Sequence, residues 1–288
     1  MRVHIARQSI RRAALVATVV WYPFSGGVAA ADAPVPSDGS LRFALVEHRI
    51  SAPEARQGVA SDGEAIYVID NSLIGKYAIA DGSLIRRFEG DPEQFPHLNS
   101  CTLVERELVC AASNYPETPH RGTVEVFDPD RLTHVRTVVL PENPGSLTVL
   151  TRRAGTWWAV FANYDGRGGV EGQDHRSTLL AELDDDFRLI RRFSLPESVL
   201  ERLKPRSISG ATWGEDGRLY MSGHDKPEVY ALELPQEGAV LRHVGSFAVA
   251  SFGQAIDLDP KDPQLLWSID RNTRAVFGSR LPPAEMAR

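Results

Sequence analysis

The chain alternates short apolar runs with tight polar turns, and one version of this pattern recurs five times. Each copy starts on small or polar residues, passes through an apolar run, a turn and a second apolar run, and ends on polar side chains. The copies begin near Gly58, Asn99, Gly145, Ser209 and Gly253. Apolar runs bounded by Gly, Asn, Asp and Ser predict antiparallel β-strands joined by hairpins.

The spacing of the copies predicts how the strands assemble. Measured from Gly58, the successive steps are 41, 46, 64 and 44 residues, and all-β repeats of this size are typical of a β-propeller with one four-stranded blade per repeat. The first four copies continue into two more apolar runs, whereas the fifth ends after three runs in all. An unpartnered apolar run at 41–48 could complete it and remove an exposed sheet edge. We therefore expect one all-β domain, residues 41–283, with five four-stranded blades closed by the N-terminal strand.

The 64-residue third step keeps a six-bladed ring open as an alternative. Its extra length either contains a degenerate blade or lies in a glycine-rich loop at 165–177 and a helix-like stretch at 196–204. We favour the loop and the helix, because the N-terminal strand already supplies what the fifth copy lacks. Residues 284–288 are then a short C-terminal tail.

The first 31 residues have the pattern of an export signal. A basic segment with four arginines leads into an apolar run at 13–24, and small residues that suit cleavage follow at 28–31. A short membrane anchor is the alternative, but the run is too short to cross a bilayer comfortably. Without this segment 28 basic residues face 38 acidic ones, a net charge of about −10. We expect a periplasmic or secreted monomer with no nucleic-acid partner, and no membrane contact after signal cleavage.

The chain has two cysteines, Cys101 and Cys110. The segment between them predicts a hairpin that turns at Glu105 and Arg106, which places the cysteines directly opposite each other. Cysteines opposed in this way are within reach of a disulfide in an oxidising compartment. Two buried thiols are the alternative, and the spacing matches no zinc site.

In a propeller, the loops that enter the inner strands and the loops that leave the second strands gather on one face, around the channel. That face is the default ligand site. The residues that we expect to bind a small molecule or glycan there are Gln57, Asn114, Tyr115, Asn163, Tyr164, Gln254 and Arg271. An Asn-Tyr pair recurs in successive copies and joins amide donors and acceptors to apolar ring faces, which suits a hydroxyl-rich ligand. For any single Asn, capping of its own turn is the alternative.

His224 and Asp225 form the candidate reactive pair, and His97 is a second candidate catalytic residue. A histidine beside a carboxylate can act as a general base or bind a metal, and a structural hydrogen-bond network is the alternative. Oxygen ligands from Asn99, Asn163 and Asp225 would suit a divalent cation, with Ca²⁺ the first choice. Asp174 and His175, in the glycine-rich loop, would be able to reach the same face.

Two segments resemble the blade signature of gluconolactonase-like and NHL-type propellers. One is SGATWGEDGRLYMS at 209–222, and the run from Gln57 to Tyr67 repeats it. The resemblance implies a metal held by a Glu that opens the first inner strand, by two Asn of later blades and by an Asp that also acts as a base. By position these fall on Gln57, Asn99, Ser209 and Asp225, of which only Asn99 and Asp225 match the pattern.

Two classes of function follow. The first is an enzyme that acts on a small hydroxylated or lactone-like substrate at the channel mouth, with metal-assisted hydrolysis as one route. The second is a non-catalytic propeller that binds a glycan, peptide or protein partner on the same face. We lean to the enzyme, because histidines and carboxylates converge there.

Overall fold

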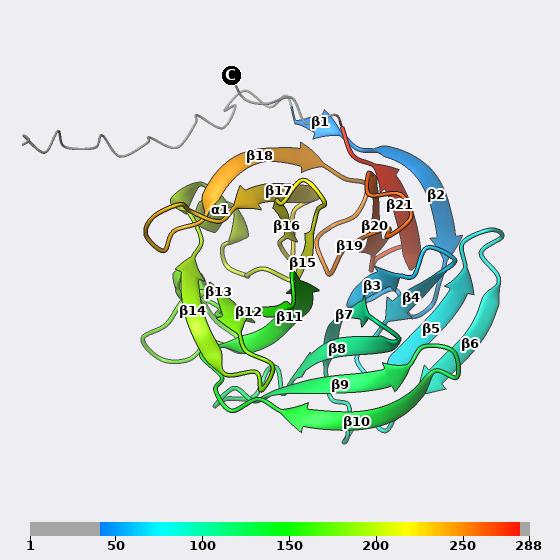
Figure 1. Ribbon diagram of the computed structural model, residues 1–288, viewed down its shortest axis with the longest axis horizontal. Helices are drawn as coiled ribbons and strands as arrows, with labels where there is room; N and C mark the ends of the chain where they lie inside the picture. Colours follow the sequence, from blue (N-terminus) through cyan, green and yellow to red (C-terminus); the bar gives the residue numbers. More distant parts are fainter. Residues whose placement is uncertain (1–40, 283–288) are drawn as a thin grey trace, which may run out of the picture. The chain divides into compact units, whose positions relative to one another are not determined.

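Five β-sheets surround a common axis and form a five-bladed β-propeller (Figure 1). A computed structural model describes residues 41–282. The predicted signal peptide at 1–31 and the tail at 284–288 lie outside the described residues. Within the described range, the predicted five-bladed ring is confirmed over the six-bladed alternative.

The strands of each blade are given in order from the channel outward. Blade one contains β3 (Gly58–Ser61), β4 (Ala65–Ile69), β5 (Leu73–Ala78) and β6 (Leu84–Glu89). Blade two contains β7 (Leu98–Val104), β8 (Glu107–Ser113), β9 (Gly122–Asp128) and β10 (Thr133–Val139). Blade three contains β11 (Ser146–Arg153), β12 (Thr156–Ala162), β13 (Leu179–Leu183) and β14 (Leu189–Ser194). Blade four contains β15 (Gly210–Trp213), β16 (Leu219–Ser222), β17 (Glu228–Glu233), β18 (Arg242–Ala248) and β1 (Arg42–Phe43). Blade five contains β19 (Asp257–Leu258), β20 (Leu265–Asp270), β21 (Ala275–Arg280) and β2 (Leu45–Ser51).

The inner strands meet around the axis and place their entry loops side by side. Contacts run from β3 to β7, from β7 to β11, from β11 to β15, from β15 to β19 and back to β3. Every residue of β4 is buried, whereas nearly every residue of the outer strand β6 is exposed. Apolar clusters fill the spaces between blades, because both faces of an inner or second strand pack against neighbours.

The N-terminal segment closes the ring, as predicted, but it is not the single strand expected at 41–48. Strand β2 pairs antiparallel with β21 and completes blade five, with Ile50 opposite Val276. Strand β1 instead pairs parallel with β18, the outer strand of blade four. The chain crosses between the two blades at Ala44, whose N–H donates to the Ala248 carbonyl oxygen at 2.9 Å. The segment therefore covers two sheet edges, and this linkage between blades was not visible in the local pattern.

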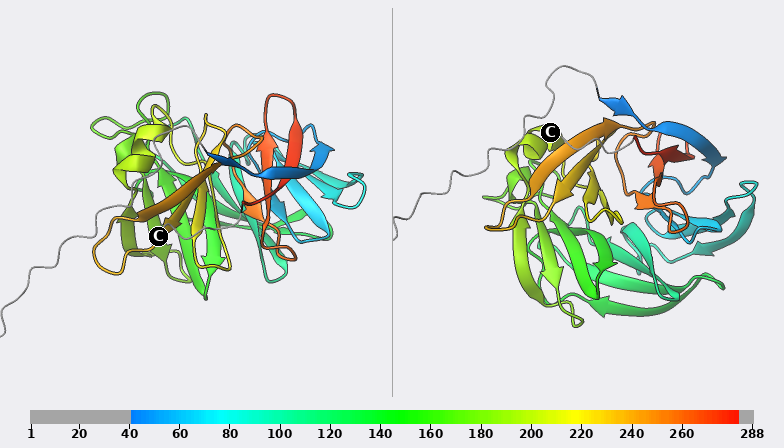
Figure 2. Two further views of the ribbon diagram at one scale, coloured as in Figure 1. Left: turned by 90° about the horizontal axis from the view of Figure 1, so that it is seen from above. Right: turned by 45° about the horizontal axis from the view of Figure 1, so that its top comes forward.

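The extra length of the third repeat lies in the predicted loop and helix. The 3₁₀ turn η1 (His175–Ser177) ends the long loop between β12 and β13, and α1 (Glu197–Leu203) follows β14. Val199 and Leu203 of α1 pack into the apolar cluster between blades three and four. Helix α1, yellow-green in Figure 2, lies at the periphery of the ring. No helix of the described residues is long and apolar enough to cross a membrane.

The predicted cysteine hairpin is confirmed. The chain turns at Glu105 and Arg106, and Cys101 lies directly opposite Cys110. The two cysteines form a disulfide. A disulfide in this position fits an oxidising compartment.

Candidate functional site

A cavity of about 220 Å³ opens at the channel mouth. Its lining comes from all five blades and from the loops that join them: Gln57, His97, Asn99, Tyr115, Thr148, Tyr164, Arg167, Arg206, Ser209, His224, Gln254 and Arg271. In an antiparallel pair, the start of one strand lies beside the end of the next, so the entry loop of each inner strand meets the exit loop of its second strand. The propeller thereby brings residues more than 200 positions apart to one cavity.

Most of the candidate catalytic, ligand-binding and metal-binding residues line the cavity, but three do not. Those that line it are Gln57, His97, Asn99, Tyr115, Tyr164, His224, Gln254 and Arg271. Ser209, which the blade resemblance places at a metal-ligand position, lines it too. Asn114, Asn163 and Asp225 are not part of the lining. Thr148, Arg167 and Arg206 were missed among its residues. Arg206 lies one residue upstream of Ser207 in the entry loop of β15, so a slightly longer window on that loop would have found it.

His224 is held between a carboxylate and a guanidinium. Its Nδ1 lies 2.5 Å from Oδ1 of Asp225, and its Nε2 lies 3.1 Å from a terminal nitrogen of Arg271. A carboxylate accepts and a guanidinium donates, so Nδ1 carries the proton and Nε2 accepts from Arg271. Burial lowers the pKa of His224, the Asp225 carboxylate opposes that shift, and the charges of Arg206 and Arg271 reinforce it. The ring is therefore neutral near pH 7.

A row of rings forms one wall of the cavity. His97 lies 5.3 Å from Tyr115 between ring centroids, and Tyr115 lies 5.2 Å from Tyr164 in an edge-to-face arrangement. Burial, followed by the positive charge of Arg271, lowers the pKa of His97 to about 4. Burial also raises the pKa of Tyr164. These rings give the wall an apolar body with polar edges.

Two glycines allow loops to approach the cavity closely. Gly168 has a φ of +83°, and a Cβ there would lie 2.3 Å from the Tyr115 ring. Gly253 has a φ of +61°, and a Cβ there would lie 2.4 Å from the carbonyl oxygens of Gly223 and His224. Glycine adopts these φ values readily, whereas a Cβ would displace the Tyr115 ring at Gly168 and the backbone at Gly253. Gly253 thereby holds Gln254 beside the His224 loop.

The asparagines predicted as ligands bond mainly to the protein itself. The amide nitrogen of Asn99 donates to the Leu147 carbonyl oxygen at 2.8 Å and to Ser113 Oγ at 3.0 Å, which links blades two and three. The amide nitrogen of Asn163 donates to the carbonyl oxygens of Pro144 and Ser177.

Asn114 bridges its own loop, since its Oδ1 accepts from Arg121 N–H and its Nδ2 donates to the Pro119 carbonyl oxygen. Of the three predicted cation ligands, Asn99, Asn163 and Asp225, only Asn99 lines the cavity. The structure therefore does not gather the predicted cation ligands at the channel mouth.

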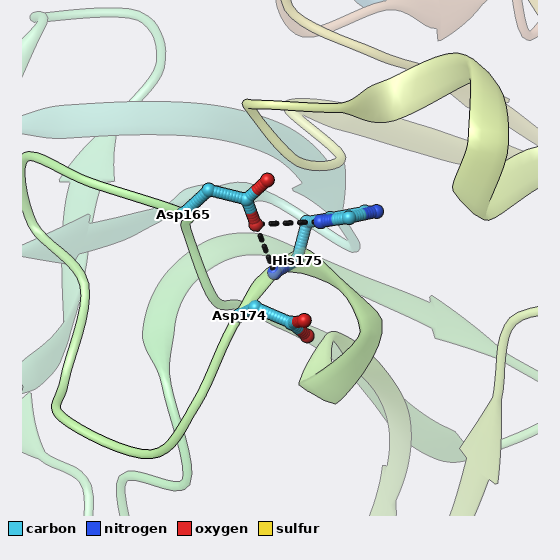
Figure 3. Close-up of side chains that lie close together, drawn as sticks. All are labelled: Asp165, Asp174 and His175. Carbon is cyan, nitrogen blue, oxygen red and sulfur yellow. Dashed lines mark hydrogen bonds and ion pairs between the residues drawn. The ribbon is translucent and has the colours of Figure 1, made fainter.

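A different group of side chains, Asp165, Asp174 and His175, has a spacing that could hold a metal ion (Figure 3). One ligand atom from each lies within 4.8 Å of the others. Asp165 Oδ1 also accepts from the His175 backbone N–H at 2.9 Å and from its Nδ1 at 2.5 Å. Asp174 caps η1 by accepting from Arg176 N–H. These bonds already fix the loop after β12, and an imidazole beside two carboxylates suits a transition metal better than Ca²⁺.

The cavity differs from a metal site in its charge. Arg167, Arg206 and Arg271 line it, and none of its lining residues is Asp or Glu. Arg206 donates to Tyr115 Oη at 3.3 Å, and Tyr115 donates in turn to the Arg167 carbonyl oxygen at 3.4 Å. The channel mouth is therefore a small, positively charged, ring-walled cavity.

Comparisons with known proteins bear on the fold alone. The chain matches no protein-family model and no curated protein. Among solved structures it is similar to the PQQ-bound aldose sugar dehydrogenase of Streptomyces coelicolor, at 12% identity over 84% of this chain and 82% of that chain, with a TM-score of 0.49. It is also similar to Kuenenia stuttgartiensis hydrazine synthase, at 13% identity over 79% and 84% of the two chains, with a TM-score of 0.47. Virginiamycin B lyase of Staphylococcus aureus shows 14% identity over 77% and 67%, with a TM-score of 0.44. No activity carries over to this chain at such values, and the β-propeller described above rests on its own strand pairing.

Proposed function

We propose that the protein is an exported propeller that binds a small hydroxylated or lactone-like molecule in the channel-mouth cavity and hydrolyses it, with His224 as general base. The observation that carries this proposal is the His224–Asp225 pair at the edge of a cavity from all five blades. Export is supported by the disulfide and by the signal-like pattern of residues 1–31.

The chemistry follows from the two ring nitrogens of His224. Asp225 holds the Nδ1 proton, which leaves the Nε2 lone pair to take a proton from water. The hydroxide formed attacks the lactone carbonyl carbon, and the ring C–O bond then breaks. The proton on Nε2 passes to the departing alkoxide, so His224 returns to its neutral form. Arg271, beside Nε2, would donate to the negative charge that develops on the carbonyl oxygen.

The remaining lining suits a polar ligand. The rings of Tyr115 and Tyr164 offer surfaces for the carbon face of a sugar-like ring. Gln57 donates its amide to Asn71 Oδ1 at 2.7 Å, which leaves the carbonyl oxygen of Gln57 to accept from a hydroxyl.

A cation in the channel mouth does not fit the lining residues. Three guanidiniums repel a divalent ion, and the cavity offers it only neutral oxygens. We therefore derive no metal-assisted step, and Ca²⁺ stays a prediction. Metal analysis of the purified protein, with thermal unfolding before and after chelation, tests it. A bound metal that stabilises the fold would direct attention to Asp165, Asp174 and His175.

Non-catalytic binding of a glycan, peptide or protein partner is the second candidate. The observation that favours it is the contact between Arg271 and His224, because the guanidinium occupies the lone pair that a general base needs. For hydrolysis, the arriving substrate must draw Arg271 away from Nε2.

Lactone hydrolysis by the wild type and by His224→Gln tests the enzymatic proposal. The rate should rise with pH as His224 loses its proton, with a midpoint below the ordinary 6.5 because burial lowers this pKa. His224→Gln should lower kcat by a factor of about 100 or more and leave KM nearly unchanged. His48→Gln, on the outer strand β2, is the matched control and should keep full activity. Binding of the same lactones without turnover would reject hydrolysis and leave the non-catalytic function.

A further inference from the structure

The three arginines of the cavity line one small space that has no carboxylate in its lining. Many other guanidiniums meet carboxylates; for example, Arg280 pairs with Glu47 and Asp262, and Arg202 pairs with Glu228. Among the described residues, by contrast, Arg167, Arg206 and Arg271 form no ion pair. Two of them have neutral side-chain partners, Tyr115 for Arg206 and His224 for Arg271.

The positive charges of these arginines act on the same part of the cavity. The charges of both Arg206 and Arg271 act on the imidazole of His224, and the charge of Arg271 also acts on His97. The chain as a whole carries a net charge of −6. Arg206 and Arg271 are half-buried, and half-buried arginines without a carboxylate partner are costly unless something else neutralises their charge.

Gln254 is a second, independent observation that points to a ligand. Its side chain is almost fully buried, at 2% exposure, and it lines the same cavity. Its amide nitrogen has no hydrogen-bond partner among the described residues. A buried N–H donor normally has an acceptor, so this amide lacks an oxygen that a bound molecule would provide.

We propose that the cavity binds the anionic group of its ligand, a carboxylate or a phosphate, between Arg206 and Arg271, with the Gln254 amide as a further donor. A guanidinium presents parallel N–H groups that match both anions. The inference rests on the proposed small-molecule site at the channel mouth, but it does not depend on hydrolysis. The ligand is then a small hydroxylated acid or a sugar phosphate and not a neutral sugar.

Matched ligands test the proposal on the wild-type protein first. Glucuronate differs from glucose in bearing a carboxylate in place of a hydroxymethyl group, and glucose 6-phosphate carries the phosphate instead. Calorimetry at low salt should show at least one of the two anions binding about tenfold or more tighter than glucose, with the advantage shrinking as salt is added. Which anion binds tighter tells a carboxylate site from a phosphate site.

Variants then locate the site. Arg206→Gln and Arg271→Gln should each weaken binding of the preferred anion by about 10- to 100-fold, because each removes a charged hydrogen bond. Arg86→Gln removes the same charge from the exposed outer strand β6 and should leave the affinity unchanged. Thermal unfolding of each variant shows whether it is folded, and the wild-type comparison stands without the variants.

The outcomes separate this inference from the proposed hydrolysis. Equal binding of glucose and both anions, or no binding of either anion at tens of millimolar, overturns the anion site. An equal loss of affinity in Arg86→Gln overturns its location. Tight anion binding by a protein that hydrolyses no lactone supports the anion site and rejects the enzymatic function alone.

Discussion

Substitutions of Asn99 test whether this residue has a structural role or the metal-binding role that its sequence context implies. In the structure its amide nitrogen donates to the Leu147 carbonyl oxygen and to Ser113 Oγ, and the residue is 7% exposed. Asn99→Ala removes both bonds. Asn99→Asp keeps the shape but replaces the donor by an oxygen that faces a carbonyl oxygen. The two substitutions therefore test what the amide does.

The magnitudes follow from the hydrogen bonds that are lost. Two buried bonds at about 1 kcal/mol each, with a carbonyl left unpaired, make Asn99→Ala cost about 2–4 kcal/mol of unfolding free energy. Asn99→Asp should cost more, because a buried charge is added and no donor remains. The new carboxyl would have a raised pKa in the folded state. Its destabilising effect should therefore be smaller at pH 5 than at pH 8.

Urea unfolding at the two pH values measures these effects, with the exposed Asn272→Asp as the matched control. The control should change stability by less than about 0.5 kcal/mol. A metal-ligand role predicts the reverse order, since a carboxylate binds Ca²⁺ better than an amide does. An Asn99→Asp variant that is as stable as the wild type, or that Ca²⁺ restores, would refute the structural role.

Two further predictions concern the hairpin and the channel wall. Replacing Cys101 and Cys110 by Ala should lower the free energy of unfolding by about 2–3 kcal/mol, because the bridge closes a short loop with a sequence separation of 9. A urea midpoint equal to that of the wild type would show that the bridge does not stabilise the fold. His97 has a folded-state pKa of about 4 against an ordinary 6.5, so its contribution to stability is complete above about pH 6.5 and is lost as the pH falls toward 4. The difference in stability between wild type and His97→Gln should therefore change across that range, by at most about 3 kcal/mol, and a constant difference would contradict the shifted pKa.

The local pattern was sufficient to predict the blades, because each hairpin is determined by residues that are close together in the sequence. The register around Cys101 and Cys110 follows from one turn, and the need for a closing strand follows from an incomplete fifth copy. The break of that strand at Ala44 was not predictable, since it depends on the edge of β18, about 200 residues away.

The site was harder to predict because the same side chain can serve a ligand or the protein. Position in the repeat was enough to predict that Asn99 and His224 lie at the channel mouth. Only the fold shows that the Asn99 amide donates to the Leu147 carbonyl oxygen. A longer window on the entry loop of β15 would have included Arg206, but the path of that loop depends on tertiary contact, such as the Asp165 N–H donating to the Pro205 carbonyl oxygen. The charge of the cavity therefore emerged only from the assembled ring.

The central claim is that one channel-mouth cavity binds a small polar ligand through its arginines. A crystal structure of the protein soaked with glucuronate and, separately, with glucose 6-phosphate tests it most directly. We expect the carboxylate or the phosphate to lie between Arg206 and Arg271, within hydrogen-bond reach of Gln254, with the sugar ring against Tyr115. An empty cavity in both structures, or a ligand whose anionic group points away from the arginines, would contradict the account.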